Sequence, residues 1–439
     1  MLNILRNRTY RHLLAAQVVA LLGTGLATVA LGLLAYDLAG ESAAMVLGTA
    51  LTIKMIAYVT IAPVAAAFAE RIDRRRMLVT LDMVRAVVAL CLPFVTEVWQ
   101  VYVLIFVLQS ASAGFTPAFQ ATIPDVLTDE QDYTKALSLS RLAYDLENLV
   151  SPMLAAMLLL VVSFDSLFWG TALGFAASAL LVVSVTLPSP APRKPRGIYD
   201  RTTRGIRIYL RTPRLRGLLA LSWSAAALSA MVLVNTVVIV RGDLGLSDSA
   251  VAIALAGFGG GSMLAAFLLP ALLERLPDRP VMLAGATLAT ATMATAALLS
   301  AVVPMSLVML TALWALVGFG YSSTLTPSGR LLTRSAHPED RTAVFAAQFT
   351  LSHACWLVLY PLSGWLMTQH GATVAMAALT VLALGGLILA AWAWPAFQPR
   401  SIAHDHPDLP ADHPHLSGPE PHAHPIIIDD LHPRYPHTP

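Results

Sequence analysis

Paired histidines are the residues of this chain whose spacing points most directly to chemistry. Eight of the twelve histidines follow residue 400, and three His-x-His pairs recur every nine residues. In an extended chain, residues i and i+2 point the same way and lie roughly 6.5–7 Å apart, so two imidazoles can close on one ion. Imidazole suits nickel, zinc, copper and cobalt. We therefore predict metal ligands at His404, His406, His413, His415, His422, His424, His432 and His437.

The stretch that carries these histidines, residues 401–439, differs in composition from the rest of the chain. It holds nine prolines and no long apolar run. Such a segment cannot bury a core, so we predict a disordered tail that binds metal. The alternative is a solvated low-complexity tail that binds nothing.

A second set of polar residues lies in an otherwise apolar stretch around residues 136–162. Helical spacing puts Arg141, Asp145 and Asn148 on one face, with Glu147 on the adjacent face. Glu147 has no basic residue three or four positions away and would lie about 16 Å into a membrane helix. A charge at that depth is costly and marks a functional candidate. We predict proton coupling or cargo binding here, although Arg141 and Asp145 could simply pair with each other.

Two further residues belong to this candidate site. Lys54 is a lysine within an apolar span, and we expect it to pair with Asp145 or Glu147. His353 lies in another apolar span, as either a cargo ligand or a hydrogen-bonded packing residue. The predicted proton-coupling and substrate residues are thus Glu147, Asp145, Asn148, Lys54, Arg141 and His353.

The composition decides what surrounds these residues. The chain of 439 residues is 56% hydrophobic and only 12% charged, whereas soluble domains carry about 25% charged residues. Lipid must therefore cover much of the surface. Since about 20 apolar residues cross a bilayer as a helix, we predict an all-α membrane protein with twelve transmembrane helices, near residues 12–36, 43–69, 77–96, 99–121, 136–162, 167–187, 217–240, 249–273, 280–301, 304–326, 342–368 and 372–395.

The basic residues predict the orientation of these spans. Of the 28 lysines and arginines, Arg241 falls in a loop on one side, Lys54 and Arg85 fall within spans, and the rest lie in or beside the segments on the other side. Basic loops stay in the cytoplasm. We therefore expect a bacterial inner-membrane protein with both termini in the cytoplasm.

The chain reads as two similar halves. Thr116-Pro117 and Thr326-Pro327 each stand where a span is expected to end, about 210 residues apart, and other landmarks repeat in register. The predicted divisions are an N-terminal six-helix half at 1–187, a basic cytoplasmic loop at 188–216, a C-terminal six-helix half at 217–400 and the tail at 401–439. Within the loop, residues 200–210 could form an amphipathic helix, or act only as a topology signal.

The loop after the second span carries a motif that resembles a known family. Residues 70–76 read Glu-Arg-Ile-Asp-Arg-Arg-Arg, which is similar to the loop signature of the major facilitator superfamily, although Ala69 and Arg75 stand where that signature usually has glycine. The resemblance covers residues 1–395 and implies the two-lobed fold of that family. It also implies that Asp73 and Arg74 latch the inner gate, with Asp278 and Arg279 as their counterparts in the second half.

Together with the histidine-rich tail, the chain resembles the NreB-type nickel-resistance exporters of that superfamily. The resemblance implies export of nickel, or cobalt, driven by proton entry. Two other functions fit the residues: a proton-coupled exporter of drugs or siderophores in which the tail is incidental or regulatory, and a membrane metal sensor that transports nothing.

Other functions lack their usual motifs. No catalytic motif appears, so we expect no enzyme and no cofactor besides the transported and tail-bound metal. The glycines from Gly257 to Gly261 lie in an apolar span, which favours close helix packing over a phosphate-binding loop. We expect a monomer whose partners are the lipid bilayer, metal ions and protons, without nucleic acid.

Overall fold

The structure is a computed structural model of the chain. It describes residues 2–39, 43–69, 72–159, 161–188, 198–246 and 248–396, together with 402–403, 423–424, 426–429, 431–432 and 435. Within some helices the backbone is described but individual side chains are not.

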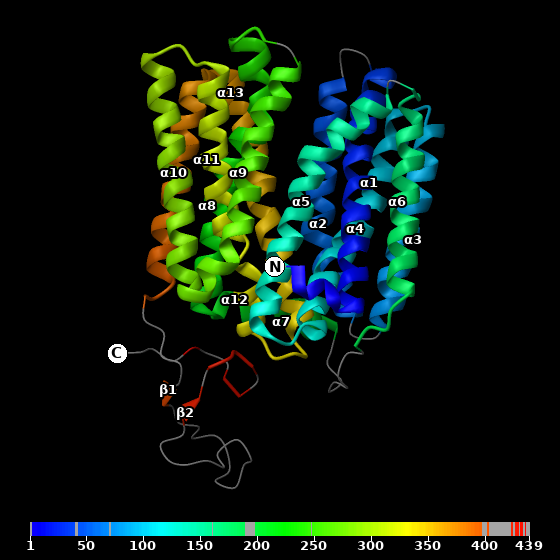
Figure 1. The fold of residues 1–439 in the computed structure, drawn as a ribbon, viewed down its shortest axis with the longest axis vertical. Coiled ribbons are helices and arrows are strands. Elements are labelled where there is room, and N and C mark those ends of the chain that lie inside the picture. The colour runs from blue at the N-terminus through cyan, green and yellow to red at the C-terminus, as the bar shows by residue number, and fades with distance from the viewer. Residues whose placement is uncertain are drawn as a thin grey trace.

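Nearly all described residues are helical (Figure 1). The helices are η1 (Leu2–Arg6), α1 (Arg8–Ala39), α2 (Ala43–Ala69), α3 (Arg74–Cys91), η3 (Leu92–Phe94), α4 (Val98–Val126), α5 (Glu130–Leu158), α6 (Asp165–Val183), α7 (Ile198–Arg211), α8 (Pro213–Val237), the π-helix η4 (Val238–Asp243), α9 (Asp248–Arg275), α10 (Asp278–Val302), α11 (Leu307–Leu325), α12 (Ser328–Arg334) and α13 (Arg341–Ala393). Two short strands, β1 (Ile402–Ala403) and β2 (Ala423–His424), pair antiparallel in the C-terminal stretch.

Nine helical segments within the described residues are long and apolar enough to cross a membrane. One of them, α13, has 53 residues, and its helical geometry is interrupted at Gly371, where φ is 77°. That conformation favours glycine and turns the chain between two stretches that are each long enough to span. Helices α2 and α5 have 27 and 29 residues. The all-helical class is confirmed, and the count of twelve spans stays a prediction.

The two Thr-Pro landmarks behave differently. Helix α11 ends at Leu325, with Thr326 as its C-cap directly before Pro327, as expected. Helix α4 instead continues through Pro117 to Val126, so the expectation that Thr116-Pro117 ends this helix is wrong. A proline removes one backbone donor, and packed membrane helices tolerate that loss.

The helices form two bundles that lie side by side (Figure 1). We call α1–α6 the N-terminal half and α8–α13 the C-terminal half. The halves meet where α2 packs against α13 and α5 packs against α9. We call the end that carries α7, α12 and the loops at 72–73, 127–129, 276–277 and 335–340 the basic end. The ribbons of the two halves come closest near this end (Figure 1).

Glycines let particular helices approach closely, as the sequence predicts. A Cβ at Gly261 of α9 would overlap the carbonyl oxygen of Ala315 in α11. A Cβ at Gly318 of α11 would in turn overlap the carbonyl oxygen of Phe258 in α9. In the N-terminal half, Gly23 of α1 faces the backbone of Thr171 in α6, whose hydroxyl donates to the Gly23 carbonyl at 2.8 Å. Backbone contact of this kind lets small residues replace side-chain packing between membrane helices.

Helix α7 corresponds to the amphipathic helix that was one of two interpretations of the basic loop, but part of it is buried rather than lying free on a membrane surface. Ile208 and Tyr209 are 3% and 0% exposed, and both belong to a core cluster with residues of α8, α12 and α13. Gly205 lies directly against the backbone of Ala343 in α13. The helix therefore packs onto the C-terminal half at the basic end.

Adjacent glycines give a matched test of the α9–α11 packing. Gly261→Ala should lower the midpoint of thermal unfolding, because overpacking typically costs about 1–3 kcal/mol. Gly260→Ala should leave it unchanged or raise it slightly, since an added Cβ meets nothing within 4 Å. Thermal unfolding of both variants in detergent micelles measures this, and equal midpoints would contradict the packing described here.

Candidate functional site

Two arginine–carboxylate networks join the halves at the basic end. In the first network, the Asp125 carboxylate at the end of α4 binds Arg74 of α3 through one oxygen. Its other oxygen accepts from Arg341 Nη1 of α13 at 2.9 Å. No side chain of the three is more than 19% exposed, so water screens these charges only in part. Arg341 thereby ties the C-terminal half to the N-terminal half.

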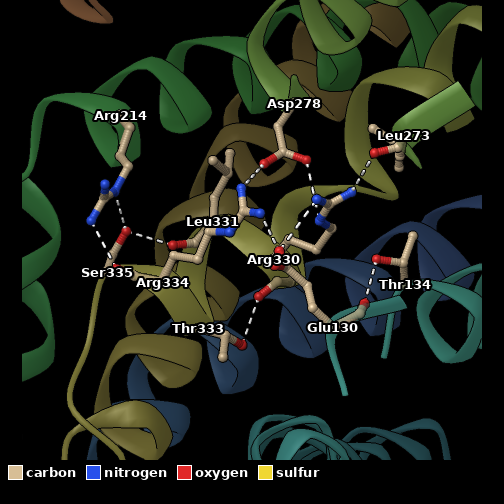
Figure 2. Close-up of polar contacts among 11 residues, drawn as sticks. Glu130, Thr134, Arg214, Leu273, Asp278, Arg330, Leu331, Thr333, Arg334 and Ser335 are labelled. Carbon is tan, nitrogen blue, oxygen red and sulfur yellow. Dashed lines mark hydrogen bonds and ion pairs between the residues drawn. The ribbon is translucent and has the colours of Figure 1, made fainter. Parts of the chain in front are cut away.

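The second network is built around Glu130, the first residue of α5 (Figure 2). Its carboxylate accepts from Arg334 of α12, and from Arg330 Nη2 at 3.3 Å. The same two arginines face Asp278 of α10, with Arg334 Nη1 at 2.9 Å from Oδ2 and Arg330 Nε at 3.4 Å from Oδ1. Glu130 therefore joins the N-terminal half to a charged cluster of the C-terminal half.

The two networks are related by the internal repeat with their charges reversed. The first places an arginine at the start of α3, a carboxylate at the end of α4 and an arginine at the start of α13. The second places a carboxylate at the start of α10, arginines in α12 and a carboxylate at the start of α5. Each half thus supplies one residue that reaches into the other half's cluster.

The loop between α12 and α13 is held on both sides. Arg214 of α8 donates from Nε to Ser335 Oγ at 2.7 Å and from Nη2 to the Arg334 carbonyl at 2.9 Å (Figure 2). Arg204 of α7 binds the Asp340 carboxylate with two donors, at 2.7 and 2.9 Å. These bonds fix the loop that separates Arg334 from Arg341, the arginines that reach across.

The four residues predicted to latch the gate divide into two kinds. Arg74 and Asp278 belong to the two networks. Asp73 instead caps α3 by accepting from the Arg76 backbone N–H at 2.9 Å. Arg279 donates to the carbonyls of Trp394 and Ala391 at 2.8 and 3.1 Å, within its own half. The hydrogen bonds described for Asp73 and Arg279 are thus those of helix ends rather than of a bridge between halves.

Glu147 lies partly exposed in α5, about 25 Å along the helix from Glu130. Lys54 of α2 lies within electrostatic range of both the Glu147 carboxylate and the His353 ring of α13. Next to Glu147, Ser151 lies against Gly25 of α1, and its hydroxyl has no hydrogen-bond partner among the side chains that are described. The structure therefore brings together three of the residues predicted from the sequence, drawn from both halves.

Aromatic rings surround this group. The Tyr58 ring of α2 lies 4.8 Å from the Phe349 ring and 4.9 Å from the His353 ring, measured between centroids. The Lys54 ammonium lies 5.6 Å from the Tyr58 ring centroid. His353 Nδ1 lies 2.7 Å from the Phe349 carbonyl and must donate to it, which leaves Nε2 as the acceptor of the neutral ring. Trp356 extends the group, 5.9 Å from His353. We call Tyr58, Phe349, His353 and Trp356 the aromatic group.

Several predicted residues lie outside the described part of the structure. The side chains of Arg141, Asp145 and Asn148 are not described, although their backbone is helical. The His424 side chain is not described either, and residues 404–422 and 437 are not described at all. Among the residues that are described, no group of three or more His, Cys, Asp or Glu could hold a metal ion. The metal prediction for the tail therefore stays a prediction.

His432 is the one predicted tail ligand whose side chain is described. It is 6% exposed, and its Nδ1 lies 2.9 Å from Asp429 Oδ1. The other oxygen of Asp429 lies 3.3 Å from Nε2 of His337 in the α12–α13 loop. Ile426 and Ile428 are each 4% exposed. Part of the stretch that we predict to be disordered, residues 401–439, is thus a described segment that packs on the basic end.

Reasoning from the sequence missed five residues of the networks, namely Asp125, Glu130, Arg330, Arg334 and Arg341. Each stands at or near the end of a predicted span, where a charge is easily taken as a topology signal. The internal repeat could have found them, because Asp125 and Arg330 are 205 residues apart and hold equivalent places with opposite charge.

Two helical halves, an internal repeat and a ring of paired charges at one end define a two-lobed membrane protein. The chain belongs to the Major Facilitator Superfamily, whose family model matches residues 13–242 and 218–417. It is accordingly a multi-pass membrane protein.

Individual relatives are more distant. Macrolide efflux protein A of Streptococcus pyogenes is 26% identical over 184 residues, 41% of this chain and 45% of that protein. An uncharacterized MFS-type transporter of Bacillus subtilis, YfiS, is 28% identical over 174 residues, 39% of this chain and 40% of that protein. The chain thus matches less than half the length of these curated relatives. The human organic anion transporter MFSD10 shares the fold, with a TM-score of 0.72 at 16% identity over 87% of this chain and 99% of that one.

The first network can be tested by unpairing and re-pairing its charges. Asp125→Asn leaves Arg74 and Arg341 facing each other, so we expect it to destabilise the protein by about 1–3 kcal/mol, between the values for exposed and buried ion pairs. Arg341→Gln in the same molecule should recover part of that loss. Thermal unfolding of the two single variants and the double variant measures the coupling, and strictly additive losses would contradict it.

The contact between His337 and Asp429 predicts a pH dependence for the packed segment. The hydrogen bond to Asp429 raises the pKa of His337 above 6.5, the ordinary value for histidine. Burial tends to raise the pKa of Asp429, but His337 and His432 outweigh it and lower that pKa. Protonated His337 therefore stabilises packing fully below about pH 6.5, and this contribution is lost as the pH rises through the raised pKa. The contribution of Asp429 is lost only in strong acid.

A spin label at Ile427→Cys, in a Cys91→Ser, Cys355→Ser background, should accordingly gain mobility as the pH rises from about 6.5 through the raised pKa of His337. His337→Gln should remove this pH dependence. An unchanged spectrum over that range in the parent protein would contradict the assignment.

Proposed function

We propose that this protein is a secondary active exporter that works by alternating access, with the basic end facing the cytoplasm. The observation that carries the proposal is that both charge networks cross between the halves at one end. A partly exposed carboxylate and a polar aromatic group lie farther along the same interface. Breaking the networks would open that interface to the cytoplasm, and re-forming them would close it behind the cargo.

We propose that Glu147 couples this movement to protons. An acidic side chain within a membrane helix is costly unless it is paired, hydrated or protonated. Lys54 is near enough to stabilise the charged form, so cargo and proton can compete for the same carboxylate. Lys54, Glu147 and His353 come from α2, α5 and α13, so a change at this site acts on both halves.

For the cargo we propose a lipophilic organic molecule. The aromatic group offers ring faces and edges beside one amine and one carboxylate, and pockets for organic molecules are largely apolar with a few polar groups. Two of the relatives are named for organic cargo, a macrolide efflux protein and an organic anion transporter. Both likenesses are distant, so they support this cargo class without specifying the compound.

A second candidate cargo is a divalent transition metal such as nickel. The three His-x-His pairs between residues 404 and 424 favour it, because paired imidazoles concentrate such ions. In this version the tail collects the ion on the cytoplasmic side, and Glu147 and His353 receive it.

Transport into inverted membrane vesicles tests the coupling. With an acidic vesicle lumen, the protein should accumulate labelled erythromycin, and collapse of the pH gradient should stop it. Glu147→Gln should remove the dependence on the gradient, because an amide cannot carry the proton. Glu97→Gln, the same change at an exposed position at the other end of the molecule, should transport as the parent protein does.

The same vesicles separate the two cargo classes. Uptake of labelled nickel without erythromycin uptake would reject the organic cargo and favour the metal. In that case, replacing the six paired histidines with asparagine should reduce uptake at low nickel. Gradient-driven transport that survives Glu147→Gln would overturn the coupling role.

A further inference from the structure

The described residues after position 425 pack on the C-terminal half. We call the described residues 426–429, 431–432 and 435 the C-terminal clamp. Ile428 and Tyr435 belong to the same apolar cluster as Ile208 and Tyr209 of α7, together with residues of α8, α12 and α13. Tyr435 also lies within electrostatic range of Arg214, the residue that holds the start of the α12–α13 loop. The clamp therefore covers the basic end beside that loop.

Asp429 organises the clamp from within. Its Oδ1 accepts from the backbone N–H groups of Leu431 and His432, at 2.9 and 2.7 Å. The backbone N–H of Asp429 donates to the His432 carbonyl at 3.3 Å. These bonds close a tight turn, of the kind that Asp stabilises through its own side chain. One carboxylate oxygen thus shapes the turn, and the other is left for His337.

The contact between Asp429 and His337 matters because of where His337 lies in the chain. His337 lies in the short loop from Ser335 to Asp340, and that loop separates Arg334 from Arg341, two of the arginines that cross to the other half. Arg334, on one side of the loop, binds Glu130. Arg341, on the other side, binds Asp125. A force on this loop therefore acts on both charge networks at once.

We propose that the C-terminal clamp holds the basic end closed by fixing the α12–α13 loop, and that its release favours opening. This inference rests on the proposed alternating access, because it assigns the clamp to that gate. The bonds from Arg204 and Arg214 hold the two ends of the loop, and the clamp adds a hold on its middle through His337. The clamp contributes no charge to either network, so it acts through the position of the two arginines.

A distance measurement across the basic end tests the clamp without any cargo. Spin labels at Ser184→Cys, at the end of α6, and Leu276→Cys, after α9, report separation of the halves in a Cys91→Ser, Cys355→Ser background. Both positions are exposed. Ile428→Ser removes the buried apolar contact, and Asp429→Ala removes the contact with His337. Each should raise the population of the longer distance about fivefold, the low end of coupling between linked sites.

Two controls separate the possible outcomes. Ile427→Ser is the same substitution at the adjacent, less buried residue and should keep the parent distances. Asp125→Asn with Glu130→Gln breaks both networks directly and should give the open population. If that variant opens but Ile428→Ser and Asp429→Ala do not, the clamp has no hold on the gate, and the gate itself stands. If the network variant also stays closed, both the gate and the clamp are rejected.

Discussion

Asp125 and Glu130 each face two arginines, and in each case at least one of those arginines belongs to the opposite half. The Asp125 side chain is mostly buried, so removing one of its partners leaves a charge that water compensates only in part, whereas Glu130 is half exposed. The halves can therefore separate at the basic end only if water or new partners take over both clusters. Every ion pair described between the halves joins a carboxylate of the N-terminal half, Asp125 or Glu130, to an arginine of the C-terminal half. When the contact breaks, the N-terminal half is left with more acidic than basic groups in these clusters, and the C-terminal half with more basic than acidic groups.

Much of this architecture could be predicted from the sequence, because it follows from patterns that repeat along the chain. The length of the apolar stretches predicts most of the helices, and the glycines near Gly261 predict close packing. For α7 the sequence left two interpretations open, an amphipathic helix and a topology signal. Glu147, Lys54 and His353 were singled out by the cost of polar groups in lipid. The charge networks could not be predicted, because ion pairing depends on which helix ends meet in space. A local sequence pattern does not contain that information. The prediction that α4 ends at Pro117 is wrong because a proline ends a helix in water more reliably than it does between packed membrane helices.

The chemistry farther along the interface is mixed, and that is what allows two classes of cargo to be considered. Tyr58, Phe349 and Trp356 provide apolar surface with polar edges. One ring nitrogen of His353 donates to the Phe349 carbonyl, so a single imidazole nitrogen remains to bind a cargo. One such nitrogen with one carboxylate is a weak set of ligands for a transition metal, whereas the rings suit a larger organic molecule. A metal cargo would need further donors from residues outside the described part of the chain.

The close glycine contacts between α9 and α11 limit how the C-terminal half of the protein can change shape. Each helix presents a bare backbone position to a carbonyl oxygen of the other, at Gly261 and at Gly318. The two backbones are in direct contact at both places, so this pair of helices has the close packing of a single unit. Any large displacement of the C-terminal half must carry α9 and α11 together as one rigid unit, and the deformation has to be absorbed elsewhere.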